Sequence, residues 1–195
     1  MGGDCLNYGC VPSKGIIRSA KAAHSVKTAA KFGVKVPQGV EIDFNTAVDN
    51  ARQARAAIAP HDSAKRYTDM GVDVFFGVAK FTGSNTLEIK GETLEFTKAL
   101  VATGSHPAHI PIPGLAETGY LTNETIFNLT ERPSGLAIIG AGPIGSELAQ
   151  SFQRLGTQVT LIDMAEHILP REDEDAAEIV QNQLVDDGIT LVLGA

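Results

Sequence analysis

A short glycine-rich run near residue 140 constrains the fold of this chain more than any other feature of its 195 residues. The run follows Leu136–Ile139, an apolar stretch typical of a strand, and precedes apolar residues at helical spacing up to Gly156. A second strand is expected over 159–162 and ends at Asp163. Strand, glycine turn, helix, strand and an acid about 20 residues after the turn predict a βαβ unit of the dinucleotide-binding type.

The glycine run is interpreted as a pyrophosphate-binding loop. Its glycines permit a tight turn, a close approach of backbone to phosphate, and close packing of the helix on the strand. Amide groups at the start of the helix would hold the phosphate charge. The competing interpretation is a glycine turn in an unrelated α/β domain. The residues expected to contact the dinucleotide are Gly140, Ala141, Gly142, Pro143, Ile144 and Gly145.

Asp163 predicts which nicotinamide cofactor is used. A carboxylate accepts hydrogen bonds from both hydroxyls of the adenosine ribose but repels a 2′-phosphate. No Arg or Lys occurs between Val159 and Pro170 to offset that repulsion. We therefore expect NAD as the cofactor, with NADH preferred over NADPH.

Cys5 and Cys10, the only cysteines of the chain, form the second informative pattern. Their spacing can meet the Cα separation of about 4.4–6.8 Å that a disulfide needs if a turn leads into a helix. Pro12 favours a helix beginning near Cys10, where the helix dipole and Lys14 would stabilise a thiolate. Redox chemistry is favoured over an inert disulfide or a zinc site, because two cysteines cannot complete a tetrahedral zinc centre.

The string GGDCLNYGCVPSK at residues 2–14 closely resembles the redox-active disulfide motif of the class I pyridine nucleotide-disulfide oxidoreductases. These flavoenzymes include dihydrolipoamide dehydrogenase, glutathione reductase and mercuric reductase. The resemblance covers essentially the whole chain. It implies that Cys10 is the thiolate beside the flavin and that Cys5 is the interchange thiol that meets the substrate. It also pairs Lys14 with Glu147 at the flavin edge, where a buried ammonium would need a compensating carboxylate.

The same resemblance implies the remaining flavin contacts and the fold. FAD would touch the backbone at Ala79 and at Thr103, Gly104 and Ser105, which end an apolar run expected to form a strand over 99–103. The implied fold is α/β, with two incomplete doubly wound, Rossmann-like nucleotide-binding domains. The FAD type would occupy residues 1–114, and the NAD type would occupy residues 115–195.

Four parts of the family pattern have no match in these residues. They are the N-terminal glycine motif for FAD, the rest of the NAD domain, the second flavin motif and the C-terminal dimer domain, which supplies an acid-base histidine. We therefore expect an interior segment of a longer enzyme, colourless and inactive by itself. The implied parent activity passes electrons from NADH through FAD to the Cys5–Cys10 disulfide and on to a disulfide or mercuric-ion substrate. The resemblance does not distinguish dihydrolipoamide from mercuric ion as the substrate. A nonenzymatic dinucleotide-binding module and an inert fragment remain the alternatives.

Composition limits the partners and the location. A formal net charge of −7 argues against nucleic acid and anionic membrane as partners. No apolar stretch approaches the roughly 20 residues needed to span a bilayer. Few thiols and no recognisable targeting signal favour the cytoplasm. No metal site is expected, since His106 and His109 merely flank Pro107 in an extended segment. The resemblance implies a homodimer in the full-length parent.

Overall fold

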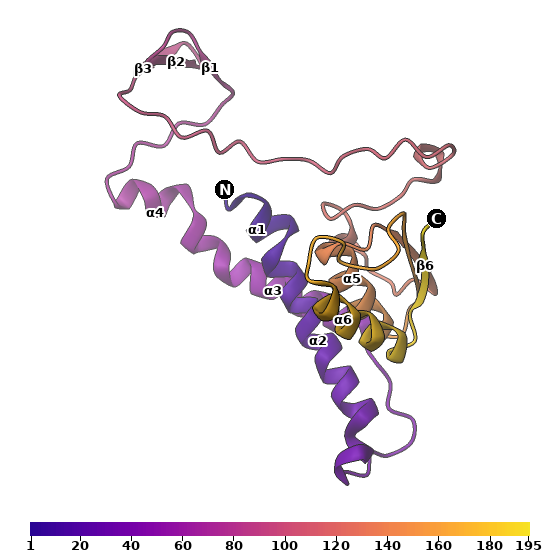
Figure 1. The fold of residues 1–195 in the computed structure, drawn as a ribbon. Coiled ribbons are helices and arrows are strands. Elements are labelled where there is room, and N and C mark those ends of the chain that lie inside the picture. Colours follow the sequence, from indigo (N-terminus) through magenta and orange to yellow (C-terminus); the bar gives the residue numbers. More distant parts are fainter.

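The computed structural model describes residues 1–195 as a helical region, a small antiparallel sheet and a parallel sheet with its own helices (Figure 1). The elements agree with the predicted α/β class. None of the helices combines the length and hydropathy that crossing a bilayer requires.

Two long helices dominate the N-terminal region. The short α1 (Gly3–Tyr8) leads into α2 (Cys10–Thr28), and α3 (Phe44–Ile58) packs beside α2. The short elements η1 (Ala29–Phe32), η2 (Ala59–Asp62) and α4 (Ala64–Asp69) complete this region.

The contact between α2 and α3 depends on a glycine. A Cβ added at Gly15 would lie 2.6 Å from both Cα and Cβ of Ala51. No side chain fits between the two helices at this point, so Gly15 sets how closely they approach. Asp43 caps α3, because its carboxylate accepts a hydrogen bond from the Thr46 amide at 3.0 Å.

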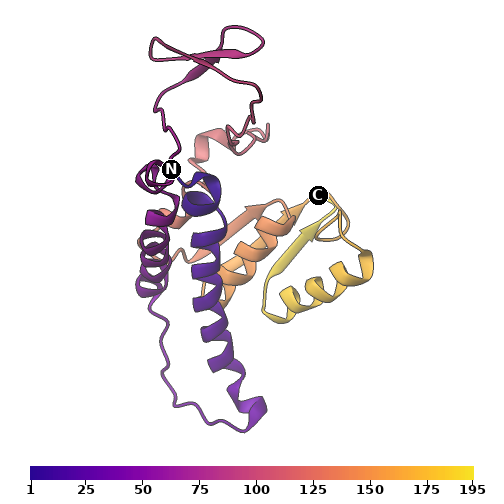
Figure 2. The same cartoon turned by 90° about the vertical axis from the view of Figure 1, so that its left-hand side faces the viewer.

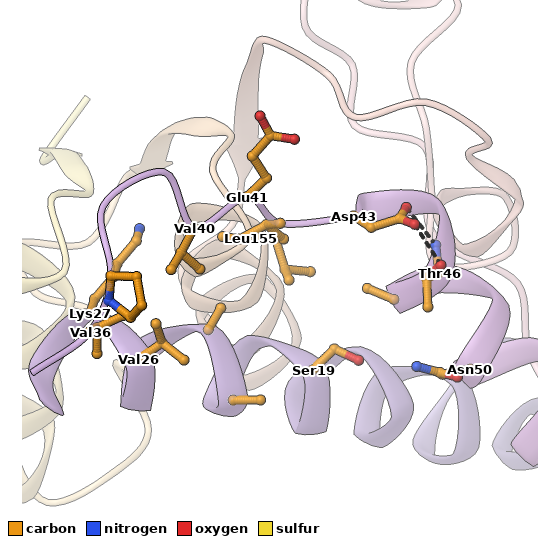
Figure 3. Close-up of a pocket in the computed structure, with 15 residues that line it drawn as sticks. Ser19, Val26, Lys27, Val36, Val40, Glu41, Asp43, Thr46, Asn50 and Leu155 are labelled. Carbon is orange, nitrogen blue, oxygen red and sulfur yellow. Dashed lines mark hydrogen bonds between the residues drawn. The ribbon is translucent and has the colours of Figure 1, made fainter. Parts of the chain in front are cut away.

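A groove of about 510 Å³ lies between α2, α3 and the segment that joins them (Figure 3). Val26, Val40 and Leu155 contribute apolar surface to it, and Lys27 and Glu41 also line it. None of the residues predicted to act in function lines this groove.

The small sheet stands apart from the helices in both views (Figures 1 and 2). It contains β1 (Ala79–Phe81), β2 (Thr86–Ile89) and β3 (Glu92–Glu95), antiparallel and in that order. The strand expected over 99–103 is absent, since residues 98–112 form neither helix nor strand and Leu100 is 93% exposed. An apolar run becomes a strand only where a neighbouring strand pairs with its backbone, and none lies alongside.

The predicted βαβ unit is confirmed in the C-terminal region. Strands β4 (Gly135–Ile139), β5 (Gln158–Asp163) and β6 (Thr190–Leu193) are parallel and adjacent in that order. Helix α5 (Pro143–Arg154) joins β4 to β5, and α6 (Glu174–Asp186) joins β5 to β6. Both helices cover the same face of the sheet (Figure 2). The 3-10 turns η3 (Ala116–Thr118) and η4 (Ile126–Asn128) precede β4.

One core of 17 buried residues joins the helical region to the parallel sheet. Phe152 of α5 is fully buried and packs against Phe44 of α3, with the ring centroids 5.9 Å apart. Ile16 of α2 and Leu161 of β5 belong to the same core. Helix α5 therefore lies between the sheet and α2, which brings the start of the cysteine-bearing helix close to the glycine loop.

Ile144 of α5 does not belong to the buried face of the helix, since it is 65% exposed. It lies in the first turn, next to the loop, whereas the buried face is made by Ser146, Ala149 and Phe152.

Candidate functional site

The two cysteines lie on either side of the junction between α1 and α2. Cys10 is the first residue of α2, as predicted, but Cys5 lies inside α1 rather than in a turn. Gly9 separates the two helices with a non-helical backbone. Both residues are exposed, and no disulfide joins them.

The two thiols interact through their side chains. A side-chain hydrogen bond to Cys10 raises the pKa of the Cys5 thiol above its usual value, because losing the proton would break that bond. Desolvation and the nearby charges of Cys10 and Asp62 act in the same direction, while a backbone hydrogen bond from Cys10 opposes them.

Lys14 and Glu147, the pair implied by the resemblance, meet in the structure. The Lys14 ammonium donates to both carboxylate oxygens of Glu147, each at 2.9 Å. The side chains are 60% and 45% exposed. An exposed pair of this kind contributes about 0–1 kcal/mol to stability. Its importance is positional, because each residue is the fifth of its helix and the contact joins the beginnings of α2 and α5.

Two glycines permit the tight turn of the glycine loop. A Cβ added at Gly145 would lie 1.9 Å from the carbonyl oxygen of Gly140, so only glycine fits there. Gly140 itself has a φ of +106°, a conformation that other residues rarely adopt. These two positions fix the tight turn between β4 and α5.

The loop is open where a pyrophosphate would bind. A Cβ added at Gly142 would meet nothing within 4 Å, so a ligand can approach this backbone closely. The amides of Ile144 and Gly145 have no backbone acceptor in the chain, and no side chain caps α5. Free amides at a helix start suit an anionic ligand. The residues present therefore fit a dinucleotide.

Asp163 lies beside the loop at the end of β5. Its Oδ2 accepts a hydrogen bond from the Ala141 amide at 2.6 Å, and its Oδ1 accepts one from the Ala165 amide at 2.8 Å. The carboxylate thus holds the loop in shape, a role that sequence reasoning did not predict. Each oxygen keeps a second lone pair for another donor.

A largely apolar cavity of about 760 Å³ borders the loop. Its walls are β4, the glycine loop and the segment 107–123 that precedes η4. The exposed Ile144 side chain faces this cavity.

The predicted flavin contacts are only partly brought together. A Cβ added at Gly104 would lie 3.8 Å from both carboxylate oxygens of Asp4, so this backbone passes beside α1. Ala79 belongs to β1, in the small sheet that stands apart from α1 and α2 (Figure 1).

Sequence reasoning missed a polar contact between His106 and Glu124. His106 Nδ1 lies 2.7 Å from Glu124 Oε1. The hydrogen bond and the charge of Glu124 raise the pKa of His106, with a smaller contribution from Asp4. The segment that carries both partners has no regular periodicity, so nothing in the sequence indicated this pair.

This chain belongs to the pyridine nucleotide-disulphide oxidoreductase family, whose sequence pattern matches residues 1–195. Among curated relatives, it is 34% identical over 195 residues to a mercuric reductase of Lysinibacillus sphaericus, covering 100% of this chain and 36% of that protein. It is also 34% identical over 194 residues to the dihydrolipoyl dehydrogenase of Bacillus subtilis strain 168, covering 97% of this chain and 42% of that protein.

Solved structures give the same result. The Cu(II) complex of the HOCl-induced flavoprotein disulfide reductase RclA from Escherichia coli superimposes with a TM-score of 0.80 at 29% identity. The match covers 100% of this chain and 41% of that one. The chain therefore spans 36–42% of the length of these three relatives.

Proposed function

We propose that this chain supplies the redox-active dithiol and the nicotinamide-binding loop of an FAD-dependent enzyme. The enzyme would move electrons from NADH to a disulfide or metal-ion substrate. One observation carries the proposal beyond family membership. The 2.9 Å contact between Lys14 and Glu147 joins the helix that begins at Cys10 to the helix that begins at the glycine loop. The dithiol that would reduce the substrate and the loop that would bind NADH thus lie at the beginnings of adjoining helices.

FAD, when bound, would carry two electrons from NADH to the Cys5–Cys10 disulfide. The substrate step then belongs to this chain's own thiols. The Cys5 thiolate attacks one sulfur of a substrate disulfide, forms a mixed disulfide and releases the first substrate thiol. Cys10 attacks Cys5, releases the second substrate thiol and closes the Cys5–Cys10 disulfide. The substrate gains two electrons and two protons, and the dithiol loses them. Exposure of both sulfurs supports this exchange.

The roles of the two thiols are tested in the full-length, FAD-loaded protein. Reduction of the wild type is expected to produce a long-wavelength thiolate-to-flavin charge-transfer band. Cys10→Ser should abolish the band, because a serine hydroxyl is not ionised at neutral pH. Cys5→Ser should keep the band and show it even without reduction, because Cys10 is then a free thiolate stabilised by the start of α2 and by Lys14. The reverse pattern would exchange the two roles. A wild type that fails to reduce its disulfide with NADH would refute the proposed activity.

The preference for NADH is part of the proposal and rests on Asp163. Its carboxylate lies at the glycine loop and pairs with no cation of the chain. A 2′-phosphate placed beside it would be repelled. Each 1.4 kcal/mol of that repulsion would lower the affinity for NADPH about tenfold. Fluorescence titration with both dinucleotides tests this, and equal or tighter binding of NADPH would contradict it.

The remaining assignments rest on the family resemblance. They are the flavin contacts at Ala79 and at Thr103–Ser105, homodimer assembly and a cytoplasmic location. The position of Gly104 beside Asp4 supports the flavin contact at Thr103–Ser105. Light scattering of the full-length protein tests the dimer.

A further inference from the structure

A backbone carbonyl between the two cysteines receives a hydrogen bond from a distant part of the chain. Tyr8 is the last residue of α1, and Gly9 separates it from Cys10. The last carbonyls of a helix have no amide within that helix to accept from. The residue four positions after Tyr8 is Pro12, which has no amide hydrogen to donate. Asn123 Nδ2 donates to the Tyr8 carbonyl oxygen instead, at 3.3 Å.

The segment that carries Asn123 is itself firmly held. The Thr122 amide donates to Thr125 Oγ1 at 2.9 Å, and the Thr125 amide donates back to the Thr122 carbonyl at 3.0 Å. Ile126 and Phe127, which follow in η4, are each 6% exposed and belong to the core. The Asn123 side chain therefore projects from a closed turn that the core anchors.

The same stretch of chain meets α1 at a second point. The backbone of Gly104 passes beside the carboxylate of Asp4. His106 Nδ1 and Glu124 Oε1, which are 2.7 Å apart, connect that part of the stretch to the neighbour of Asn123. The stretch from 104 to 124 thus lies against both ends of the short helix α1.

The hydrogen bond to Tyr8 acts at the one flexible point between the two thiols. A carbonyl lies in the plane of its peptide, so a donor on the Tyr8 oxygen restricts the peptide that joins Tyr8 to Gly9. Gly9 has a φ of −132° and a ψ of −114°, outside the helical region, and glycine sets few limits on its own backbone. Rotation at Gly9 would turn α1 against α2 and move Cys5 relative to Cys10.

We propose that Asn123 is a positioning residue for the dithiol, which holds the Tyr8 carbonyl so that Cys5 and Cys10 stay at the separation from which their disulfide closes. This inference rests on the proposed function and concerns its last step. In that step the Cys10 thiolate bonds to the Cys5 sulfur, and the bond from Cys5 to the substrate sulfur breaks. The substrate leaves with the electron pair as a thiolate and takes up a proton. Asn123 acts on this step through the Tyr8 backbone.

The test compares three variants with the wild type in the full-length, FAD-loaded protein. Asn123→Leu keeps nearly the same side-chain shape and removes the donor. Asn123→Asp keeps the shape and turns an acceptor toward the carbonyl. Asn128→Leu is the matched control, because Asn128 is an exposed asparagine of the same segment, five residues further on.

Two measurements on the thiols follow the closing step. Anaerobic protein is reduced with dithiothreitol, freed of it and mixed with one equivalent of 5,5′-dithiobis(2-nitrobenzoate). One coloured thiolate is released when Cys5 forms the mixed disulfide, and a second when Cys10 closes the ring. The phase that is absent from Cys10→Ser identifies the closing step. Glutathione redox buffers then give the equilibrium constant for formation of the Cys5–Cys10 disulfide.

We expect Asn123→Leu to lower both the rate of the closing phase and the equilibrium constant about two- to tenfold, the factor that one hydrogen bond typically contributes. Asn123→Asp should lower them at least as much, because a carboxylate oxygen would face the carbonyl oxygen. The first phase should keep its wild-type rate, since attack by Cys5 does not depend on where Cys10 lies. Asn128→Leu should match the wild type in both measurements.

The outcomes separate this role from the proposed function. A wild type that shows no closing phase lacks the dithiol chemistry and refutes the proposed function itself. With a closing phase present, the positioning role is overturned if Asn123→Leu closes its disulfide with the wild-type rate and equilibrium constant. It is also overturned if both phases slow equally, or if Asn128→Leu shows the same loss. Should Asn123→Leu fail to fold, Asn123→Asp carries the same comparison.

Discussion

Gly145→Ala is expected to damage the fold of the glycine loop rather than its chemistry. The added Cβ would lie 1.9 Å from the Gly140 carbonyl oxygen, whereas real Cβ contacts essentially never fall under 3.0 Å. The backbone of the loop must therefore move by more than about 1 Å. Overpacking of this kind costs about 1–3 kcal/mol. For a chain of this size, each kcal/mol lowers the melting temperature by about 2–4 °C. The expected decrease is about 2–12 °C.

Gly142→Ala is the matched comparison, because Gly142 lies in the same loop, three residues before Gly145. An added Cβ there meets nothing within 4 Å, and its φ of −71° suits alanine. The melting temperature should stay at the wild-type value. The methyl group would nevertheless occupy the space through which a pyrophosphate approaches the backbone, so NADH affinity should fall.

Circular dichroism melts and NADH fluorescence titrations on both variants separate the two effects. A Gly145→Ala protein that melts with the wild type would show that the loop relaxes without cost, which refutes the steric reasoning. A Gly142→Ala protein that binds NADH as tightly as the wild type would refute the assignment of the phosphate site.

Three further predictions concern other contacts. Gly15→Ala should lower the melting temperature by an amount similar to Gly145→Ala, because its Cβ would lie 2.6 Å from the Ala51 backbone; an unchanged melt would contradict the close packing of α2 on α3. Cys5 of the reduced wild type should react with iodoacetamide only at higher pH than Cys5 of Cys10→Ala, since the hydrogen bond to Cys10 raises its pKa; coincident pH profiles would rule out that bond. His106 should titrate above the usual histidine range by NMR and return toward it in Glu124→Gln. Because the folded-state pKa is raised, any stabilisation from this pair is present at low pH and is lost as pH rises through that value; an unshifted His106 would contradict the pairing.

The sequence by itself determined the elements whose causes are local. The βαβ unit follows from apolar periodicity and from a loop in which Gly145 has no room for a side chain. The start of α2 at Cys10 follows from Pro12, which fixes φ and lacks an amide hydrogen in the first turn. Neighbouring residues decide these features, so they can be deduced without knowing the rest of the chain.

Only the tertiary structure decided which charged groups are buried and which are not. Lys14 and Glu147 are 133 residues apart, and their meeting was implied by resemblance, but their exposure followed from the packing of α5 on α2. Asp187 would be expected in solvent, because aspartate side chains are almost never fully buried unless they are paired. Its burial arises because α2, α5 and α6 converge there.

The missing strand over 99–103 has the same physical origin. Its apolar residues favour a strand, but a strand also needs a neighbour to satisfy its backbone. Local preference therefore fixed where helices, turns and the glycine loop begin. Long-range contacts fixed burial, pairing and strand formation, because each of these depends on which distant residues lie alongside.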